Sequence, residues 1–374
     1  MKKGWETKRI EELCDVEYGT RVVNKRDGGT IYPVYGGGGA TFFMDKFNRE
    51  DCFIVSRFAM SEQCTRFVNG KFFLNDSGLS VKPKNTKEIS QEFLNLELLH
   101  LNDKIYSLAR GTAQKNLDVP AFRNTLITFP ISLREQQRIV SILDKCFEAI
   151  DRAKLNAERN LKNTKELYES YVDRMFDNKG EGWEEKTLEE ICEFRNGAAH
   201  EQFIDEDGTF ILVNSKFISS DGNKGKRTNS ALSPLFKDEI AFVMSDVPNG
   251  KALAKCFLVK EDGTFTLNQR IGAIKSKLLI PEFLLYQFNR NKYLLSFNNG
   301  ENQTNLRKGD ILKCPLWLTS KKEQQMVVNQ LTSIRAQTHK LELAYEQKIS
   351  DLDELKKSIL QKAFSGELNT EITL

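Results

Sequence analysis

The sequence lacks the features that mark secreted, disulfide-linked and membrane-spanning proteins. Its seven cysteines, at positions 14, 52, 64, 146, 192, 256 and 314, form no CxxC pair, which argues for reduced thiols rather than a disulfide framework. No apolar stretch follows the two N-terminal lysines, so no signal peptide is recognisable. No run approaches the roughly 18 apolar residues that a transmembrane helix needs. We therefore expect a soluble cytoplasmic protein.

A large excess of positive charge is also missing. The formal net charge of the 374 residues is only +3, with 29% charged and 40% hydrophobic residues. Lysine and arginine are interleaved with acidic residues, as on solvated helices, so any surface for nucleic acid must be local. The length suits two domains, each able to bury a core of its own.

Motifs for catalysis are absent as well. No GxxxxGK[ST] string is present for binding ATP. An adenine methyltransferase would need a glycine-rich loop between a strand and a helix, and YGGGGA at 35–40 lacks that context. It would also need a Pro-Pro-aromatic motif, but SPLF at 233–236 has Leu235 in place of the second proline. Because the three histidines, at 100, 200 and 339, are isolated as well, we expect no catalytic residue, metal or cofactor.

What the sequence does contain is an internal repeat. Three segments of the first half return in the same order in the second: 4–20 as 182–198, GTAQKNL at 111–117 as GENQTNL at 300–306, and EQQRIV at 135–140 as EQQMVV at 323–328. The offset grows from 178 to 188 residues, which places a net insertion inside the second copy. The order of the matches indicates two copies of one plan.

Each EQQ motif opens a long helical pattern. Apolar residues recur at alternating steps of four and three, from Ile139 to Met175 and from Val327 to Ile359, which is typical of a coiled coil. The ranges 135–176 and 323–364 have 42 residues each, which corresponds to about 63 Å of helix. The linker at 177–182 is too short to lead the chain back along such a rod, so we expect antiparallel pairing.

The globular halves combine short β-like runs with short helical segments, separated by Gly, Asn and Asp turns. We therefore predict an α+β fold, with two similar curved, β-rich domains separated by a long antiparallel two-helix coiled coil with pseudo-two-fold symmetry. The predicted parts are a first domain at 1–134, a first helix at 135–177, a second domain at 178–322, a second helix at 323–365 and a tail at 366–374.

Recognition chemistry remains where catalytic motifs are missing. Basic and amide side chains suit contacts with phosphates and base edges. The candidates for DNA binding are Lys25, Arg26, Arg57, Arg66 and Arg110 in the first half, and Lys224, Lys226, Arg227, Asn268, Gln269 and Arg270 in the second. For each of them an ordinary solvated surface position is the alternative.

Four features together resemble the specificity subunits of type I restriction-modification enzymes: the start GWETKRIEEL, the GxxQxNL element, the proline followed by EQQ, and the ending LKKSILQKAFSGEL. The resemblance covers the whole chain. It implies two target-recognition domains without an active site, each followed by a long helix. The implied partners are double-stranded DNA, two methyltransferase subunits and two ATP-driven restriction subunits. One departure is PLWLTSKKEQQ, which is three residues longer than PISLREQQ.

The repeat also divides the roles within each half. Sequence that both halves share cannot read two different half-sites, so base reading is expected from 20–105 and 199–290. Gln114 and Gln303, in the shared GxxQxNL element, are expected in the scaffold or on phosphates. The shared helix starts are candidates for binding identical partner subunits, with simple helix initiation as the alternative: Glu135, Gln136, Gln137, Glu323, Gln324 and Gln325.

We therefore expect a chain that reads a two-part DNA site with a fixed spacer and directs adenine methylation or cleavage by its partners. With about 34–36 Å per DNA turn, helices of this length place the half-sites between one and two turns apart. A coiled-coil interaction scaffold without a DNA role is the alternative. An enzyme that cuts DNA on its own is disfavoured by the missing motifs.

Overall fold

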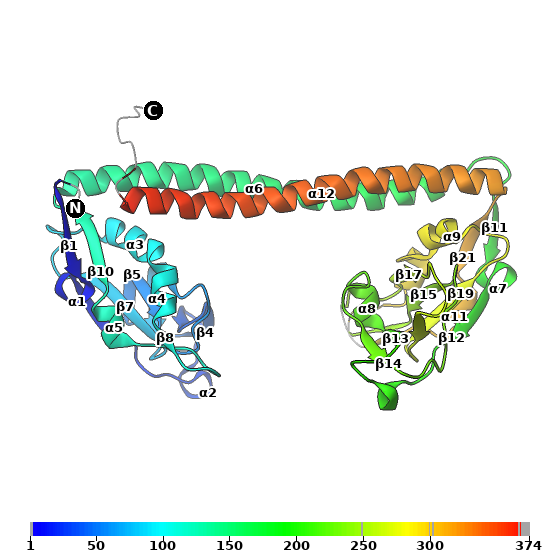
Figure 1. Ribbon diagram of the computed structural model, residues 1–374, viewed down its shortest axis with the longest axis horizontal. Coiled ribbons are helices and arrows are strands. Elements are labelled where there is room, and N and C mark those ends of the chain that lie inside the picture. Colours follow the sequence, from blue (N-terminus) through cyan, green and yellow to red (C-terminus); the bar gives the residue numbers. More distant parts are fainter. Residues whose placement is uncertain (1–2, 248–249, 299, 301–302, 366, 368–374) are drawn as a thin grey trace. The chain divides into compact units, whose positions relative to one another are not determined.

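The computed structural model describes residues 3–247, 250–298, 300, 303–365 and 367. Contacts divide the chain into two compact units. Unit 1 comprises Met1–Asn160 with Tyr345–Leu374, and unit 2 comprises Leu161–Ala344. Each unit holds one β-rich domain together with segments of both long helices (Figure 1).

A six-stranded sheet forms the centre of unit 1, in the order β2-β7-β5-β6-β3-β4. Neighbouring strands are antiparallel, except that β3 and β6 run parallel. Most of β5 and β7 is buried, as expected for the middle of a covered sheet. The bounds are β2 Cys14–Tyr18, β3 Tyr32–Tyr35, β4 Ala40–Met44, β5 Arg49–Ser56, β6 Thr65–Leu74 and β7 Gly78–Pro83.

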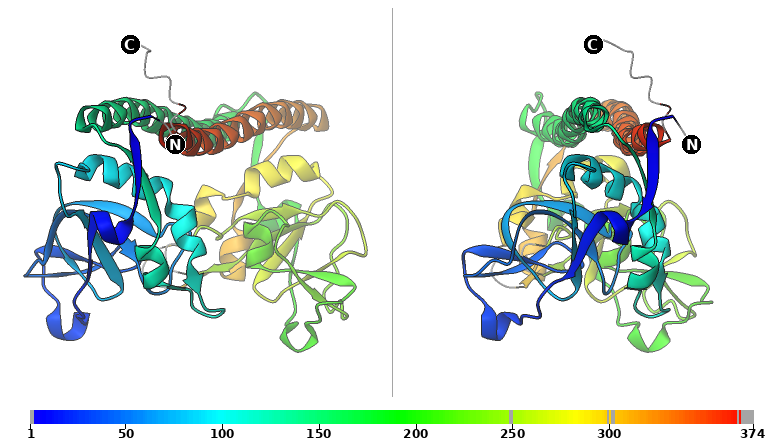
Figure 2. Two further views of the ribbon diagram at one scale, coloured as in Figure 1. Left: turned by 60° about the vertical axis from the view of Figure 1, so that its left-hand side comes forward. Right: turned by 90° about the vertical axis from the view of Figure 1, so that its left-hand side faces the viewer.

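A two-stranded ribbon of β1 and β10 leads from this domain to the helix pair, as both views of Figure 2 show. Helix α3 follows the sheet and begins at a serine cap, because Ser90 Oγ accepts a hydrogen bond from the Phe93 amide. The remaining elements are β1 Trp5–Arg9, α1 Ile10–Leu13, α2 Asn24–Asp27, α3 Gln91–His100, α4 Asn102–Ser107, β8 Ala109–Arg110, β9 Asn116–Leu117, α5 Val119–Arg123 and β10 Leu126–Pro130.

Unit 2 divides the same plan between a four-stranded sheet, β12-β19-β15-β17, and a three-stranded sheet, β14-β13-β18. Its ribbon pairs β11 with β21. The strands are β11 Glu184–Thr187, β12 Glu193–Asn196, β13 Phe210–Val213, β14 Lys226–Thr228, β15 Ile240–Val243, β16 Ser245–Asp246, β17 Cys256–Leu258, β18 Phe265–Leu267, β19 Ile271–Lys275, β20 Thr304–Asn305 and β21 Pro315–Leu318. The short helices are α7 Leu188–Ile191, η1 Glu201–Phe203, α8 Ser215–Ser219, α9 Pro281–Phe288, α10 Lys292–Leu295 and α11 Lys308–Leu312.

The two domains differ most where one long strand is replaced by two short ones. In unit 1, β6 pairs with β5 along one part and parallel to β3 along another. In unit 2, β17 pairs with β15 and β18 pairs parallel to β13, so that residues 259–264 interrupt the equivalent of β6. The connection from β13 to β14 is also longer than that from β3 to β4 and contains α8. Insertions of the second copy therefore lie at strand ends.

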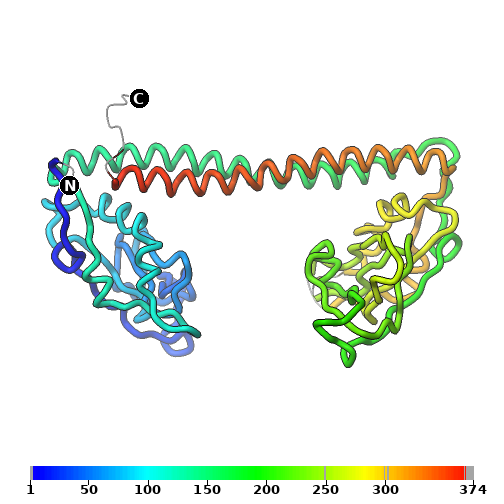
Figure 3. Tube along the Cα trace, in the orientation of Figure 1, coloured from blue at the N-terminus to red at the C-terminus, as the bar shows by residue number. Residues whose placement is uncertain are grey.

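Two long helices, α6 Leu133–Asp177 and α12 Lys321–Phe364, lie side by side in opposite directions (Figure 3). In unit 1 two ion pairs join the antiparallel helices, Lys154–Asp353 at 2.6 Å and Lys356–Asp151 at 2.9 Å. In unit 2 the guanidinium of Arg335 lies 5.1 Å from the ring centroid of Tyr168. The predicted α+β fold with antiparallel helices is confirmed.

The alternating steps of four and three in the second helix predict Leu341 and Leu355 on the buried face, and both predictions are wrong, since Leu355 is 46% exposed. Leu341 is 47% exposed, and the neighbouring Glu342 is buried in its place. The carboxylate tolerates burial because Arg335 donates a hydrogen bond of 2.8 Å to it. The steps from Ile334 through Thr338 to Glu342 are thus four and four, which shifts the buried face by one residue.

The helix ends are fixed to each domain by matching aromatic clusters. In unit 1, Phe364 of α12 packs edge-on against Phe93, which packs against Trp5. In unit 2, Phe176 of α6 contacts both Phe283 and Trp183. Among the described residues, no helix is both long enough and apolar enough to cross a membrane.

Candidate nucleic-acid interface

A tight turn occupies the same place in both units, between the equivalents of β6 and β7. Asn75 Oδ1 accepts a hydrogen bond of 3.2 Å from the Ser77 amide, and Asn268 Oδ1 accepts one of 3.3 Å from the Arg270 amide. The backbone amides of the two asparagines donate to the parallel strand beside the turn: Asn75 to Tyr35 O and Asn268 to Val213 O. Asn268 therefore holds the turn through its Oδ1, and its role in base reading stays a prediction.

Close backbone packing fixes this turn further. A Cβ atom at Gly19 would lie 2.0 Å from Asn75 O, and one at Gly197 would lie 2.1 Å from Asn268 O. Only glycine allows this approach. The turns at 75–78 and 268–271 thus share one scaffold, but the two side chains at its tip differ: Asp76 and Ser77 in unit 1, Gln269 and Arg270 in unit 2.

The GxxQxNL element forms a short two-stranded hairpin in unit 1 and pairs β16 with β20 in unit 2. The Leu117 amide donates to Arg57 O, and the Leu306 amide donates to Met244 O, so the element docks on the end of β5 or β15 in the same way. Gln114 and Gln303 are exposed at this edge. Gln303 donates to Ser245 Oγ at 2.8 Å.

Each unit carries an arginine where the turn and this element meet, although the two occupy different scaffold positions. In unit 1 it is Arg57, whose guanidinium lies 4.8 Å and 4.3 Å from the ring centroids of Tyr18 and Phe58. In unit 2 the equivalent of Arg57 is Met244, and the Met244 amide bonds to the carbonyl of Arg270. Arg270 is exposed. Together with the turn tip and the glutamine, these arginines define what we call the turn surface of each unit.

The other unit 1 candidates lie in three places. Arg66 is half-buried beside the 36–39 loop, 3.9 Å from where a Cβ of Gly39 would be. Arg110 on β8 forms an ion pair with Asp118. Lys25 and Arg26 lie on α2, at the end of the domain remote from the helix pair (Figure 1), and the Arg26 guanidinium lowers the pKa of the adjacent Asp27.

The other unit 2 candidates are exposed on the longer β13–β14 connection, on β14 itself and on the turn. Lys224 follows α8, and its amide donates to Ser220 Oγ. Lys226 and Arg227 lie on β14, where Arg227 donates to Gly208 O at 3.0 Å. Gln269 donates to Glu201 Oε1 at 3.2 Å. The structure therefore brings Gln269, Arg270 and Gln303 to one surface and leaves the β14 group as a second.

Within each EQQ motif at a helix start, the first glutamine is buried and its two neighbours are not. Gln136 and Gln324 are fully buried, and each makes three hydrogen bonds to its own domain. Gln136 accepts from the Ser90 amide and donates to Glu88 O and Pro130 O, all at 2.8 Å. A buried side chain cannot meet a partner, so Gln136 and Gln324 are anchors between helix and domain. Glu135, Gln137, Glu323 and Gln325 keep accessible surface.

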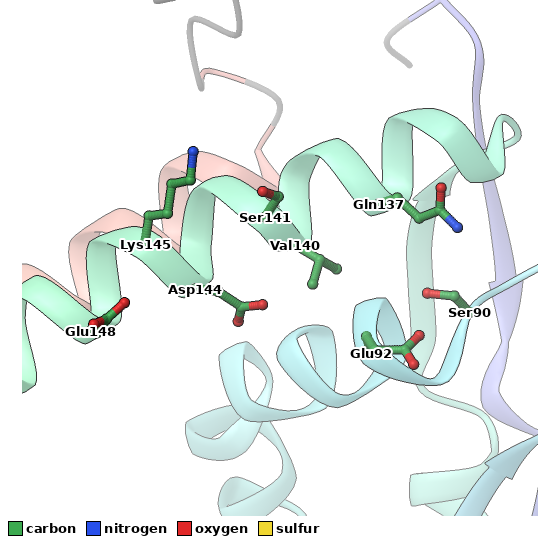
Figure 4. A pocket seen from close by; sticks show the side chains of 8 residues that line it. All are labelled: Ser90, Glu92, Gln137, Val140, Ser141, Asp144, Lys145 and Glu148. Carbon is green, nitrogen blue, oxygen red and sulfur yellow. The ribbon is translucent and has the colours of Figure 1, made fainter. Parts of the chain in front are cut away.

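A cavity of about 390 Å³ lies between α3 and α6 of unit 1, next to Gln137. Figure 4 shows Val140 and Asp144 pointing from α6 toward α3. At the corresponding place of unit 2, Tyr286 of α9 hydrogen-bonds to Thr332 of α12 at 3.1 Å. The surface beside the helix start thus differs between the units.

Two β-rich domains with matching turns, each anchored to the start of one long helix and the end of the other, define a duplicated recognition protein. The family model described as "Type I restriction modification DNA specificity domain" matches residues 2–159 and 180–350. The chain therefore belongs to the type I restriction-modification DNA specificity family.

Solved structures show the same fold. A chain from a structure concerned with complex assembly and conformational transition of the type I restriction-modification system is 18% identical, with 98% of this chain and 99% of that chain covered and a TM-score of 0.73. The HsdS subunit from Thermoanaerobacter tengcongensis is also 18% identical, with 98% of both chains covered and a TM-score of 0.52. Among curated proteins, none matches the sequence.

Proposed function

We propose that the chain reads a two-part DNA site, one half with each unit, and directs methylation or cleavage of adenine-containing targets by partner subunits. The observation that carries this proposal is the pair of turn surfaces. A shared scaffold of asparagine, glycine and GxxQxNL element displays different side chains in the two units. Such a design suits a protein that docks two half-sites alike and distinguishes their bases, because phosphate contacts position a protein while base contacts specify sequence.

The side chains of the turn surfaces have the required chemistry. An arginine can donate two hydrogen bonds to guanine, and a glutamine amide can pair with adenine. Arg57 is held between two rings, so little conformational freedom is lost when it binds. Lys25, Arg26, Arg66, Arg110, Lys224, Lys226 and Arg227 are proposed as additional backbone or groove contacts, and Gln114 and Gln303 as contacts at the edge of the element.

The long helices are proposed to set the spacing of the half-sites. Helices of 45 and 44 residues correspond to about 68 Å and 66 Å of rise. With about 34–36 Å per turn of DNA, the two half-sites would be one to two turns apart. We take 1–134 and 178–322 as the recognition domains and the segments at 135–177 and 323–365 as the spacer.

The chain itself is proposed to be non-catalytic, without a bound cofactor, and to assemble with two methyltransferase and two restriction subunits in the cytoplasm. The accessible residues of the helix starts, Glu135, Gln137, Glu323 and Gln325, are proposed to meet them. They occupy equivalent positions in the two units, which suits two identical partners.

The direct test maps methylated adenines genome-wide in cells with and without this gene, alongside the partner genes. We expect one two-part motif that depends on the gene. Exchanging residues 20–105 for those of another member should change one half of the motif, and removing one heptad from both helices should shorten its spacer. A motif that changes in both halves after the exchange contradicts the assignment of one half-site to each unit.

The purified chain gives a second readout. With a methyltransferase partner present, binding to duplex DNA should weaken steeply as salt concentration rises. Absence of any salt-dependent binding, together with intact assembly, would favour an interaction scaffold without a DNA role.

A further inference from the structure

One buried acid in unit 1 has no place in the recognition chemistry. Glu97, on the inner face of α3, is only 3% exposed. The Thr128 amide of β10 donates a hydrogen bond that favours its charged form, but desolvation dominates and raises the pKa of Glu97 from 4.5 to about 8. Among the described residues, Glu97 Oε2 has no hydrogen-bond partner.

The equivalent residue of unit 2 shows what this position requires. Helices α3 and α9 share the sequence EFL, at 92–94 and 282–284, which aligns Glu97 with Gln287. The ribbon registers agree, because Thr7 pairs with Thr128 just as Glu185 pairs with Trp317. Gln287 bridges both backbone groups of Trp317: its Oε1 accepts from the amide at 2.6 Å and its Nε2 donates to the carbonyl at 3.1 Å.

A charged carboxylate can imitate only half of this bridge. It accepts from the Thr128 amide, but it has no hydrogen to donate to the Thr128 carbonyl. A protonated carboxyl group has both an acceptor and a donor, in nearly the shape of the glutamine amide. The free Oε2 is the atom that corresponds to the donating Nε2 of Gln287.

We propose that Glu97 is a proton-binding site, at which the neutral carboxyl group donates to the Thr128 carbonyl and fastens α3 to β10 as Gln287 fastens α9 to β21. The proton is taken from solvent and released to solvent, and no other bond changes. Ionisation leaves the Thr128 carbonyl without this donor and places a charge between α3 and β10. This proposal goes beyond the proposed function and does not rest on it.

Burial, rather than the surrounding charges, favours the neutral acid. Lys104 on α4 is the charged group that acts on Glu97, and its effect is smaller than that of desolvation. His100, on α3 itself, stacks on Phe364. Several other ionisable groups on elements packed against α3 are engaged elsewhere: Lys8 on β1, Asp103 and Tyr106 on α4, Arg66 and Lys71 on β6, Lys82 on β7, and Glu135 with Arg138 on α6. Asp144, Lys145 and Glu148 of α6 line the open cavity beside α3.

Protonation of Glu97 should affect the start of α6, because Glu97 lies beside the strand that leads into this helix. Strand β10 leads directly into α6, and the Gln136 anchor of α6 bonds to Ser90, the cap of α3. Since the folded state holds this proton more tightly than the unfolded state, the contribution of Glu97 to stability is greatest at low pH and is lost as pH rises from 4.5 to about 8. Unit 1 should therefore hold its helix start less firmly in alkaline solution, whereas unit 2 should not.

Glu97→Gln tests this directly in the full chain, because the amide keeps the donor at every pH. We expect the urea midpoint of the variant to exceed that of the unchanged chain, by a difference that grows between pH 4.5 and about 8 and is constant above. The infrared band of a protonated carboxyl group should be present in the unchanged chain at neutral pH and absent from the variant.

Gln287→Glu is the matched variant and should introduce the same pH dependence into unit 2. Glu92→Gln, an exposed change on the same helix, should leave the pH profile unaltered. The proposal is overturned if Glu97→Gln is no more stable than the unchanged chain at alkaline pH, or if its infrared spectrum retains the band.

Discussion

The two units attach the helices by the same contacts but present different chemistry at their turn surfaces. Gln136 and Gln324 make equivalent buried bonds, and aromatic clusters hold the opposite helix end in both units. At the turn surface, Arg57 extends from the end of β5 in unit 1, whereas Arg270 extends from the turn in unit 2. The repeated sequence therefore builds the support, and the side chains at the turn surfaces are among the features that differ between the units.

The largest effect is expected from substitution of the buried glutamines that anchor the long helices, Gln136 and Gln324. Gln136→Leu and Gln324→Leu each remove three hydrogen bonds and leave backbone groups without partners. At about 1–3 kcal/mol for each orphaned group, we expect each change to lower the free energy of unfolding by about 3 kcal/mol or more, measured by urea denaturation. The exposed neighbours provide controls, since Gln137→Leu and Gln325→Leu should change it little. If only one unit responds, the supports are not equivalent.

A smaller loss of stability is expected when the glycines that pack against the turns are replaced by alanine. Gly19→Ala and Gly197→Ala would bring a Cβ within 2.0 and 2.1 Å of a carbonyl oxygen, and overpacking of this kind costs about 1–3 kcal/mol. Thermal unfolding should show similar losses for both. Gly38→Ala and Gly309→Ala, whose Cβ atoms would meet nothing within 4 Å, are the controls. Unequal losses would show that the two turns do not bear the same strain.

Substitution of the two arginines should distinguish the roles of the two units in DNA binding. Arg57→Ala and Arg270→Ala are each expected to weaken specific binding by about tenfold, or about 1.4 kcal/mol. Each should relax a different half of the motif, as competition with single-base variants of the site would reveal. Lys277→Ala, at an exposed position away from the turn, should have no such effect. An arginine whose loss weakens all sequences equally contacts phosphate rather than a base.

The smallest effect concerns the helix pair of unit 1. Lys154→Ala removes the ion pair with Asp353 on the exposed side of the helices, and exposed pairs contribute about 0.2–1 kcal/mol. Asp353 also raises the pKa of Lys154, so the pair should weaken as salt increases. A double-mutant cycle with Asp353→Ala measures the coupling. A coupling well above 1 kcal/mol would mean that this register depends on more than apolar packing.

The fold was largely predictable from the sequence, because it is carried by strong repetitive signals. The repeat indicated two similar domains, and the alternating apolar steps with a short linker indicated antiparallel helices. The misplaced Leu341 shows the limit of that argument, since a buried acid with an arginine partner imitates an apolar position. Short elements such as β16 and β20 depend on distant pairing and leave no periodic signal.

The candidate site was less predictable. Gln136 lies three residues before Ile139 and seven before Leu143, both buried, so the helical period could have placed it on the inner face. The equivalence of the two turns was missed because only Phe-x-Leu-Asn at 72–75 and 265–268 is shared, which is too short to align without the strand partners. Glu97 resembles an ordinary helix acid until its glutamine counterpart is known. Which basic residue meets which base depends on docking geometry and remains a prediction.

The division of the helices between the units has a consequence for synthesis. Unit 2 is one continuous stretch, 161–344, whereas unit 1 combines 1–160 with a segment that begins at 345. The first domain to leave the ribosome is therefore completed only after the second, because Phe364 belongs to its core. Until then its apolar face on α6 lacks its final covering, and premature termination near residue 350 would damage the domain furthest from it in sequence.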